Sequence, residues 1–400
     1  MASGEFLAFM NILRVDLMGV FSETMTQNIK QLLFAGLTLL LVNSAFSQQK
    51  PWMLGPFERP SNAQPIISPI SNTQFQDPMS GRSVKWESMA TFNPAAIVKD
   101  GKVHVIYRAE EKLGEKEIGG HTSRLGLATS SDGFTFSRGK EPIFYPGEDL
   151  QKEFEWTGGT EDPRIVETPP RRAGAEGFYV LTYTQWNRDV PRLAVATSKD
   201  LKNWEKHGPI FKEWKEGKYH NVESKSGAIV TELRDGKLVA AKIQGKYWMY
   251  YGVPHILLAT SDDLVNWVPV ENHEGNRVPV LSPRPGFFDS WLVEAGPPPL
   301  LTKDGIVVLY NAGNSQQVGV KNLGNRVYTG GQALFDAAEP WKLLDRTTDP
   351  FIQPELPFEK SGQYPEGTTF LEGLVYFQGK WLLYYGTADS MVGVVSTPAK

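Results

Sequence analysis

The sequence predicts an all-β protein folded as a five-bladed β-propeller. No long stretch has helical periodicity, and two patterns repeat along the chain. In the first pattern, a strand enters a turn of small residues with an aspartate, and an aromatic residue follows. Successive copies start 62 to 74 residues apart, the fourth degenerate and the fifth truncated, at Ala128, Ala196, Ala259, Ala333 and Val395.

The second pattern interleaves with the first. A glycine opens a turn, and five or six residues later a strand rich in β-branched or aromatic residues reaches a tyrosine. Five repeats of roughly 65 residues, each with about four short strands, are typical of a five-bladed propeller. A many-stranded β-sandwich is the alternative, but it does not explain two interleaved repeats. The pairs are Gly101/Tyr107, Gly177/Tyr183, Gly245/Tyr250, Gly305/Tyr310 and Gly379/Tyr384.

The N-terminal segment 25–47 has the pattern of a secretory signal. Lys30 supplies the positive charge, residues 32–42 form the apolar stretch, and residues 45–47 form a small-x-small cleavage site. A membrane anchor is the alternative, although the apolar run is short for a bilayer span. We therefore expect export to a bacterial periplasm or secretion, no membrane association after cleavage, and one catalytic domain over residues 48–400. Residues 1–24 precede the signal as an unusual extension.

Composition narrows the classes of function. The net charge of −4 gives no reason to expect nucleic acid, and the absence of cysteine excludes thiol nucleophiles and cysteine-based zinc. The six histidines are dispersed, and no phosphate loop or Gly-x-Ser-x-Gly elbow occurs, so we expect no metal and no cofactor. The 11 Trp and 14 Tyr favour a sugar as partner, because flat rings stack on sugar rings.

The segment Gly158–Ile165 contains two adjacent carboxylates, a proline and an arginine after a glycine turn. Because adjacent side chains of a strand point to opposite faces, only one of Glu161 and Asp162 is expected to face a site. A carboxylate held beside a cation suits acid catalysis. The alternative is a loop-end aspartate that pairs with Arg164 at the surface.

Residues 159–164 and 384–389 together resemble glycoside hydrolase family 130, and further matches appear in the order of the family. The resemblance implies a five-bladed propeller that acts on β-mannosides, with an oligosaccharide as partner. Most described members are inverting phosphorylases, and others hydrolyse β-1,2-mannosides. The supporting segments are Phe92–Ala95, Tyr107–Arg108, Ser123–Gly126, Ala241–Tyr247 and Ala295–Pro297.

The resemblance also implies residue roles. Asp162 matches the general acid, which in the phosphorylases is thought to act through the mannose 3-hydroxyl. Asn93, Arg124 and Asp389 match positions that hold the mannose; a turn-capping asparagine and a loop aspartate are the alternatives for Asn93 and Asp389. The expected substrate-binding residues are Asn93, Arg108, Arg124, Arg164, Lys242 and Asp389.

Two departures from the phosphorylase pattern favour hydrolysis. Asn311 stands where phosphorylases carry a phosphate-binding histidine, and Glu294 stands where they carry a glycine. A carboxylate there opposes phosphate and suits a general base. Glu223 is a second base candidate, or else a salt-bridge partner of Lys225. Export also favours hydrolysis, because a sugar phosphate released outside the cell is not directly metabolised.

We therefore expect an inverting β-mannoside hydrolase, with β-1,2 as the preferred linkage. Arg108 and Lys242 match cationic positions of the phosphorylases, so a mannoside phosphorylase that makes mannose 1-phosphate is the main alternative. Two less favoured interpretations are a non-catalytic sugar-binding propeller and a glycosidase of the arabinanase or invertase type. The oligomeric state stays open.

Overall fold

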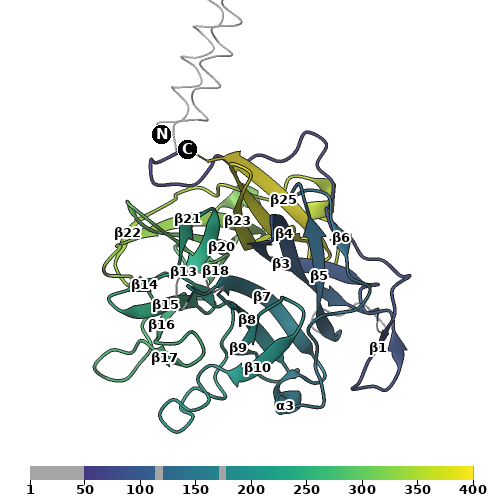
Figure 1. Cartoon of the computed structure of the whole chain (residues 1–400). Helices are drawn as coiled ribbons and strands as arrows, with labels where there is room; N and C mark the ends of the chain where they lie inside the picture. Colours follow the sequence, from purple (N-terminus) through teal and green to yellow (C-terminus); the bar gives the residue numbers. More distant parts are fainter. Residues whose placement is uncertain (1–48, 113–119, 171–176, 400) are drawn as a thin grey trace, which may run out of the picture. The chain divides into compact units, whose positions relative to one another are not determined.

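The computed structural model describes residues 49–112, 120–170 and 177–399, and the strands lie in one compact unit that starts at Trp52. The expected signal segment 25–47 and the extension 1–24 lie outside the described residues. The described chain is nearly all-β, as expected (Figure 1). Its helical elements are one short α-helix, α3 (Lys152–Glu155), and two 3-10 turns, η1 (Lys321–Leu323) and η2 (Pro357–Glu359). No described helix is long and apolar enough to cross a membrane.

Most strands form antiparallel meanders in chain order. The first meander contains β3 (Ala90–Lys99), β4 (Lys102–Glu110), β5 (Ser123–Ser130) and β6 (Ser137–Arg138). The second contains β7 (Gly159–Glu167), β8 (Tyr179–Trp186), β9 (Arg192–Ser198) and β10 (Trp204–Pro209).

The third group is more broken. Its sheet contains β11 (Ala228–Ile229), β14 (Lys242–Ile243), β15 (Lys246–Tyr251), β16 (Leu257–Ser261) and β17 (Trp267–Pro269). A separate hairpin contains β12 (Thr231–Arg234) and β13 (Lys237–Ala240). Strand β13 runs parallel to β7, and β12 runs parallel to β19 (Leu300–Thr302).

The fourth group contains β18 (Leu292–Ala295), β19 (Leu300–Thr302), β20 (Gly305–Gly313), β21 (Tyr328–Phe335) and β22 (Leu343–Arg346). The fifth contains β23 (Thr369–Phe377), β24 (Lys380–Thr387) and β25 (Met391–Pro398). Bridges from Glu58 and Ile67 to β25 bring the start of the described chain beside its end. A separate hairpin joins β1 (Phe75–Gln76) to β2 (Ser83–Val84).

The first sequence pattern corresponds to one recurring turn. After β5, β9, β16 and β21, an aspartate carboxylate accepts hydrogen bonds from the backbone N–H groups two and three residues further on. This local bonding closes the turn without help from the rest of the fold. The repeated aspartates are therefore structural. They are Asp132, Asp200, Asp263 and Asp336.

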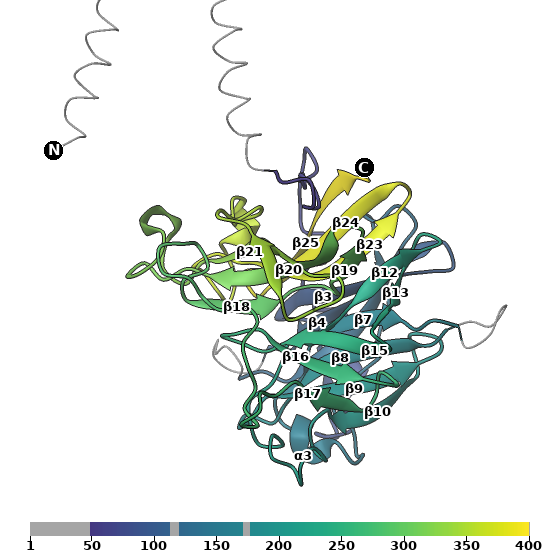
Figure 2. The ribbon, with the colours of Figure 1, turned by 90° about the vertical axis from the view of Figure 1, so that its left-hand side faces the viewer.

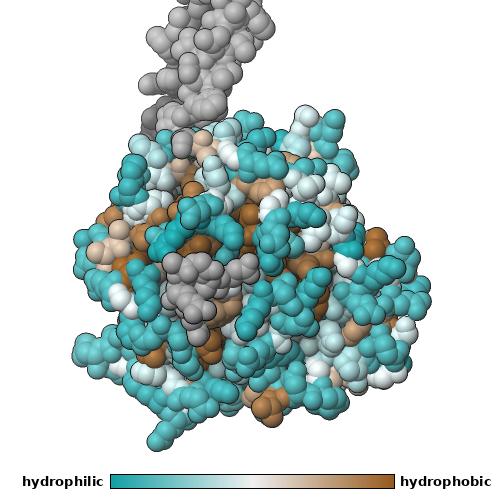
Figure 3. Space-filling model, viewed as in Figure 1, coloured by the Kyte–Doolittle hydropathy of each residue, from teal (hydrophilic) through white to brown (hydrophobic). Residues whose placement is uncertain are grey.

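The tyrosines of the second pattern form part of the core between neighbouring sheets. All five are fully buried, and each phenol oxygen donates a hydrogen bond to a carboxylate or a backbone carbonyl. Burial of such large side chains stabilises the contacts between the sheets. Strands β3, β7 and β23 also pack against one another near the centre of the molecule (Figure 2). Hydrophilic side chains cover most of the face shown in Figure 3, with small apolar patches between them.

Candidate active site

A pocket of about 310 Å³ is lined by residues from four of the five strand groups and from the segment 223–225. Its lining contains six carboxyl groups and two cations. Aromatic rings, including Trp186, Tyr328 and Tyr364, form part of its wall. Such a mixture of flat rings and polar groups suits a sugar. The carboxyl groups are Glu110, Glu161, Asp162, Glu223, Glu294 and Asp389, and the cations are Arg108 and Lys225.

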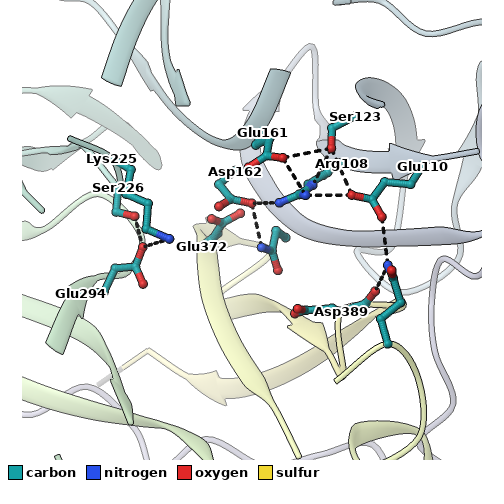
Figure 4. Close-up of polar contacts among 12 residues, drawn as sticks. Arg108, Glu110, Ser123, Glu161, Asp162, Lys225, Ser226, Glu294, Glu372 and Asp389 are labelled. Atoms are coloured by element: carbon teal, nitrogen blue, oxygen red, sulfur yellow. Dashed lines mark hydrogen bonds and ion pairs between the residues drawn. The ribbon is translucent and has the colours of Figure 1, made fainter. Parts of the chain in front are cut away.

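Arg108, on β4, is the centre of the larger polar cluster (Figure 4). Its Nη1 donates to Oδ1 of Asp162 at 3.0 Å. Its Nη2 donates to Oε1 of Glu110 at 2.7 Å and to Oε1 of Glu161 at 2.8 Å. Its Nε donates to Oγ of Ser123 at 3.0 Å. One guanidinium therefore orients three carboxylates through charge-assisted hydrogen bonds.

The backbone near Asp162 does not follow regular strand geometry. The register of β7 against β8 shifts between Glu161 and Arg164, and Asp162 has a φ of 47°. Because this bulge breaks the alternation of side chains, Glu161 and Asp162 both line the pocket. The expectation that only one of them faces the site was wrong for this reason.

Asn93 and Asp389 share this unusual backbone, with φ values of 45° and 50°. Asn93 lies where β3 shifts register between Phe92 and Pro94. Asparagine and aspartate adopt left-handed conformations more readily than most residues, and such conformations gather at functional sites. Three of the predicted site residues are therefore held at backbone positions that constrain their direction.

Burial and neighbouring charges separate the pKa values of these carboxyl groups. Burial raises the pKa of Glu161 to about 7 against the opposing effect of Arg108, and nearby Asp162 and Glu110 raise it further. Burial likewise raises the pKa of Asp389 to about 7. Burial also acts to raise the pKa of Asp162, but Arg108, Lys225 and the hydrogen bond from Asn93 outweigh it and lower this pKa. Near neutral pH, the protons of this cluster are therefore held by Glu161 and Asp389 rather than by Asp162.

Glu294, on β18, lies across the pocket from the Arg108 cluster (Figure 4). It is 1% exposed and accepts a hydrogen bond from Oγ of Ser226. The ammonium of Lys225 lies 3.5 Å from its Oε1, and Glu294 is the main cause of the raised pKa of Lys225. Lys225 thus pairs with Glu294 rather than with Glu223, which is exposed.

Six of the nine predicted site residues line this pocket. The other three do not line it. Arg124 is fully buried and pairs with Asp77 and Glu111. Lys242 is exposed, with its ammonium 4.8 Å from the ring centroid of Tyr247. A motif match identifies a residue but not the direction of its side chain. The six predicted residues that do line the pocket are Asn93, Arg108, Asp162, Glu223, Glu294 and Asp389.

Arg164 is the third of these residues. It is 1% exposed, and its guanidinium contacts backbone carbonyls and the carboxylate of Glu372. It therefore does not form the surface pair with Asp162 that the local sequence left open. Its side chain is not part of the pocket lining.

Asn311, which stands at the position of the phosphorylase histidine, is also outside the pocket lining. Its Nδ2 donates to the carbonyl of Leu371 at 3.1 Å, and its Oδ1 accepts from the N–H of Leu371 at 2.7 Å. This pair of bonds joins β20 to β23. The side chain has a structural role in this chain.

Sequence reasoning missed several polar residues of the site. Glu110 lies two residues beyond Arg108 on one strand, so side-chain alternation predicts that both face the same side. Gln363 donates to Oε2 of Glu110 and to the carbonyl of Asp389, both at 2.9 Å. Ser226 and Gln363 lie outside the strands, in segments with no periodic signal. The described residues contain no group of three or more metal-binding side chains that could hold a metal ion.

Residues 57–400 match the model of glycoside hydrolase family 130, described as beta-1,4-mannooligosaccharide phosphorylase. A 1,2-beta-oligomannan phosphorylase of Thermoanaerobacter sp. (strain X514) is 34% identical, over 78% of this chain and 90% of its own. A Beta-1,2-mannobiose phosphorylase of the same organism is 32% identical, over 83% and 94%.

Solved structures are more similar. One, from the GH130 family and described with glycoside hydrolases that target beta-1,2 mannosidic linkages in Candida mannan, is 54% identical with a TM-score of 0.84, over 88% of this chain and 97% of that chain. A putative glycosidase from Bacteroides thetaiotaomicron is 51% identical with a TM-score of 0.84, over 87% and 98%. The resemblance seen in the motifs is confirmed, and the chain belongs to glycoside hydrolase family 130, a family of enzymes that act on β-mannosides.

Proposed function

We propose that this protein hydrolyses β-1,2-linked mannosides with inversion, with Asp162 as general acid and Glu294 as general base. The charge of the pocket carries the proposal. Six carboxyl groups face two cations in the lining, a formal balance of −4 when all are ionised. Both cations already contact carboxylates, Arg108 three of them and Lys225 one. A phosphate dianion would therefore meet repulsion and no uncommitted cation in this lining.

The base assignment favours Glu294 over Glu223. Glu294 is buried and held by Ser226 and Lys225, whereas Glu223 is exposed at the pocket. A base must hold one water against the sugar, which requires a fixed carboxylate. In inverting enzymes the acid and the base stand roughly 6.5–9.5 Å apart, with that water between them. Placement of Asp162 and Glu294 on opposite sides of the pocket supports this arrangement (Figure 4).

A general acid needs a proton, but the surroundings of Asp162 lower its pKa and favour its ionised form. Its neighbours Glu161 and Asp389 have pKa values of about 7 and hold protons below that pH. Carboxyl groups this close titrate as one unit. We infer that a bound mannoside, whose hydroxyls compete for Arg108 and Asn93, shifts one proton of this cluster to Asp162.

For the fold, we propose a single five-bladed β-propeller over residues 48–400. The five strand groups, each a mainly antiparallel meander, support one blade each. The bridges of Glu58 and Ile67 to β25 support closure of the last blade by the N-terminal segment. We also propose export to the periplasm or secretion, from the signal pattern at 25–47. Mass spectrometry of the processed N-terminus checks this; an intact segment 25–47 in the exported protein contradicts cleavage.

The decisive experiment incubates the protein with β-1,2-mannobiose, with and without inorganic phosphate. We expect mannose as the product in both cases, at equal rates, and proton NMR should show the α-anomer first. The phosphorylase alternative draws support from the names of the curated relatives. A rate that depends on phosphate, with mannose 1-phosphate as product, would establish that alternative and overturn hydrolysis.

A further inference from the structure

We propose that Arg164, anchored by Glu372, is a positioning residue that fixes the spacing between the carboxyl groups of Asp162 and Glu294. The inference rests on the proposed function, because it takes these two groups as acid and base. It gives Arg164 a role that differs from the substrate contact expected from sequence. The side chain is 1% exposed and does not line the pocket.

The guanidinium of Arg164 contacts both sides of the site through the backbone. Its Nη1 donates to the carbonyl of Asp162 itself at 3.1 Å. Its Nη2 donates to the carbonyl of Ala295 at 2.8 Å, and its Nε donates to that of Gly296 at 2.9 Å. Ala295 and Gly296 directly follow Glu294. One planar group therefore bonds the peptide at the acid and the two residues that follow the base.

Among the described residues, no β-ladder links the strand of Asp162 to the strand of Glu294. β7, which carries Asp162, pairs with β5, β8 and β13, and β18, which carries Glu294, pairs with β20. The acid and the base thus lie on strands that share no backbone hydrogen bonds. The rigid fork of an arginine can hold three carbonyls at set angles, which a lysine cannot do.

The conformation of Asp162 adds a reason for such support. Its φ of 47° lies in the left-handed region, at a bulge. Conformations of this kind persist when surrounding contacts hold them. The bond from Nη1 of Arg164 to the carbonyl of Asp162 is one such contact, formed two residues away within the same bulge. Loss of this bond should let the aspartate carboxyl move from its place.

The carboxyl group of Glu372 also contacts the guanidinium of Arg164. It lies on β23, where the register shifts between Leu371 and Gly373, and it is fully buried. Its Oε1 lies 3.0 Å from Nη1 of Arg164. Neither of its oxygens accepts a hydrogen bond from the described residues. Burial raises the pKa of Glu372 well above the usual range, against the effect of Arg164. A carboxyl group in such a place lowers stability, so orientation of Arg164 is the benefit we assign to it.

The test compares Arg164→Lys with a matched control, Arg346→Lys, on β-1,2-mannobiose. Arg346 is also a buried arginine that does not line the pocket. It is ion-paired with Asp289 at 2.6 Å and bonded to the carbonyl of Ser282 at 2.8 Å. Misplacement of reacting groups by about 1 Å costs roughly 100-fold in rate. We expect Arg164→Lys to lower kcat per folded molecule about 10- to 100-fold while KM stays within about twofold.

Arg346→Lys should lose thermal stability and keep kcat per folded molecule. A purely structural Arg164 would behave in the same way, and that result overturns the proposal. A raised KM with unchanged kcat overturns it as well, since it would indicate direct substrate binding. If Arg164→Lys does not fold, Glu372→Gln decides: a selective fall in kcat supports the proposal, and a parental kcat contradicts it. Parent protein that cleaves no β-mannoside would instead sink the proposed function itself.

Discussion

Nδ2 of Asn93 donates a 2.8 Å hydrogen bond to Oδ1 of Asp162, and the two residues share a left-handed backbone. They lie on β3 and β7, each at a break in strand register. Burial acts to raise the pKa of Asp162, and this bond lowers it together with the larger effects of Arg108 and Lys225. The amide of Asn93 on β3 thus influences both the pKa and the orientation of the Asp162 carboxylate on β7.

Replacement of Asn93 should therefore change the pH profile. Asn93→Gly removes the amide and keeps a residue that tolerates φ of 45°. Without this donor the pKa of Asp162 should rise, which moves the alkaline limb of kcat/KM to higher pH because the general acid then keeps its proton further. The value of kcat/KM at the optimum should fall about 10-fold. Steady-state kinetics across pH checks this, with Asn93→Ala as a control that adds backbone strain. If this limb does not shift, Asn93 does not influence the pKa of Asp162.

Asp162→Asn should remove catalysis and preserve the fold. An amide cannot donate the proton to the leaving oxygen, and general acids contribute about 10² to 10⁴ in rate. We expect at least a 100-fold fall in kcat, with unfolding temperature close to that of the parent. Binding of mannobiose by calorimetry should survive. Turnover near the parental rate would remove Asp162 from the mechanism, and a parent that binds without turnover would favour the sugar-binding propeller.

Glu294→Gln and Glu223→Gln form a matched pair for the base. Glu294→Gln should lower kcat at least 100-fold, because an amide cannot accept the proton of the attacking water. Glu223→Gln should change kcat less than tenfold. Azide, a small anionic nucleophile, should restore part of the activity of the first variant by forming mannosyl azide. The reverse ranking of the two variants would move the base to Glu223.

The raised pKa values of Glu161 and Asp389 predict how stability depends on pH. Their folded-state pKa values are about 7, against ordinary values of 4.5 and 3.8. The folded protein therefore binds protons that the unfolded chain releases. This stabilising contribution is complete below about pH 4 and is lost as pH rises through 7. Melting temperature should fall between about pH 4 and 7, and Glu161→Gln should flatten that fall. A parental slope in the variant would contradict the assignment.

Local patterns in the sequence predicted much of the structure. The aspartate turns and the buried tyrosines depend on neighbours a few residues away, so their repetition is visible in the chain. The carboxylate Asp162 and the partner Asn93 were identified through motifs, and the structure brings them together. Assignment of the strands to five propeller blades remains a prediction.

The errors came from features that depend on long-range packing. Side-chain alternation assumes a regular strand, and the bulge at Asp162 removes that assumption. Arg164 faces backbone carbonyls from a segment more than 130 residues away. Lys225 contacts Glu294 although the local sequence pairs it as well with Glu223. Contacts of this kind leave no periodic signal in a single sequence.

The carboxyl-rich lining has a consequence for the choice of sugar. A glycan that carries phosphate or uronic acid groups would bring negative charge to a pocket whose two cations already contact carboxylates. Such a glycan should be excluded at neutral pH, and less strongly as Glu161 and Asp389 take up protons below pH 7. Neutral mannosides should therefore be better substrates than mannosides that carry phosphate or uronic acid groups.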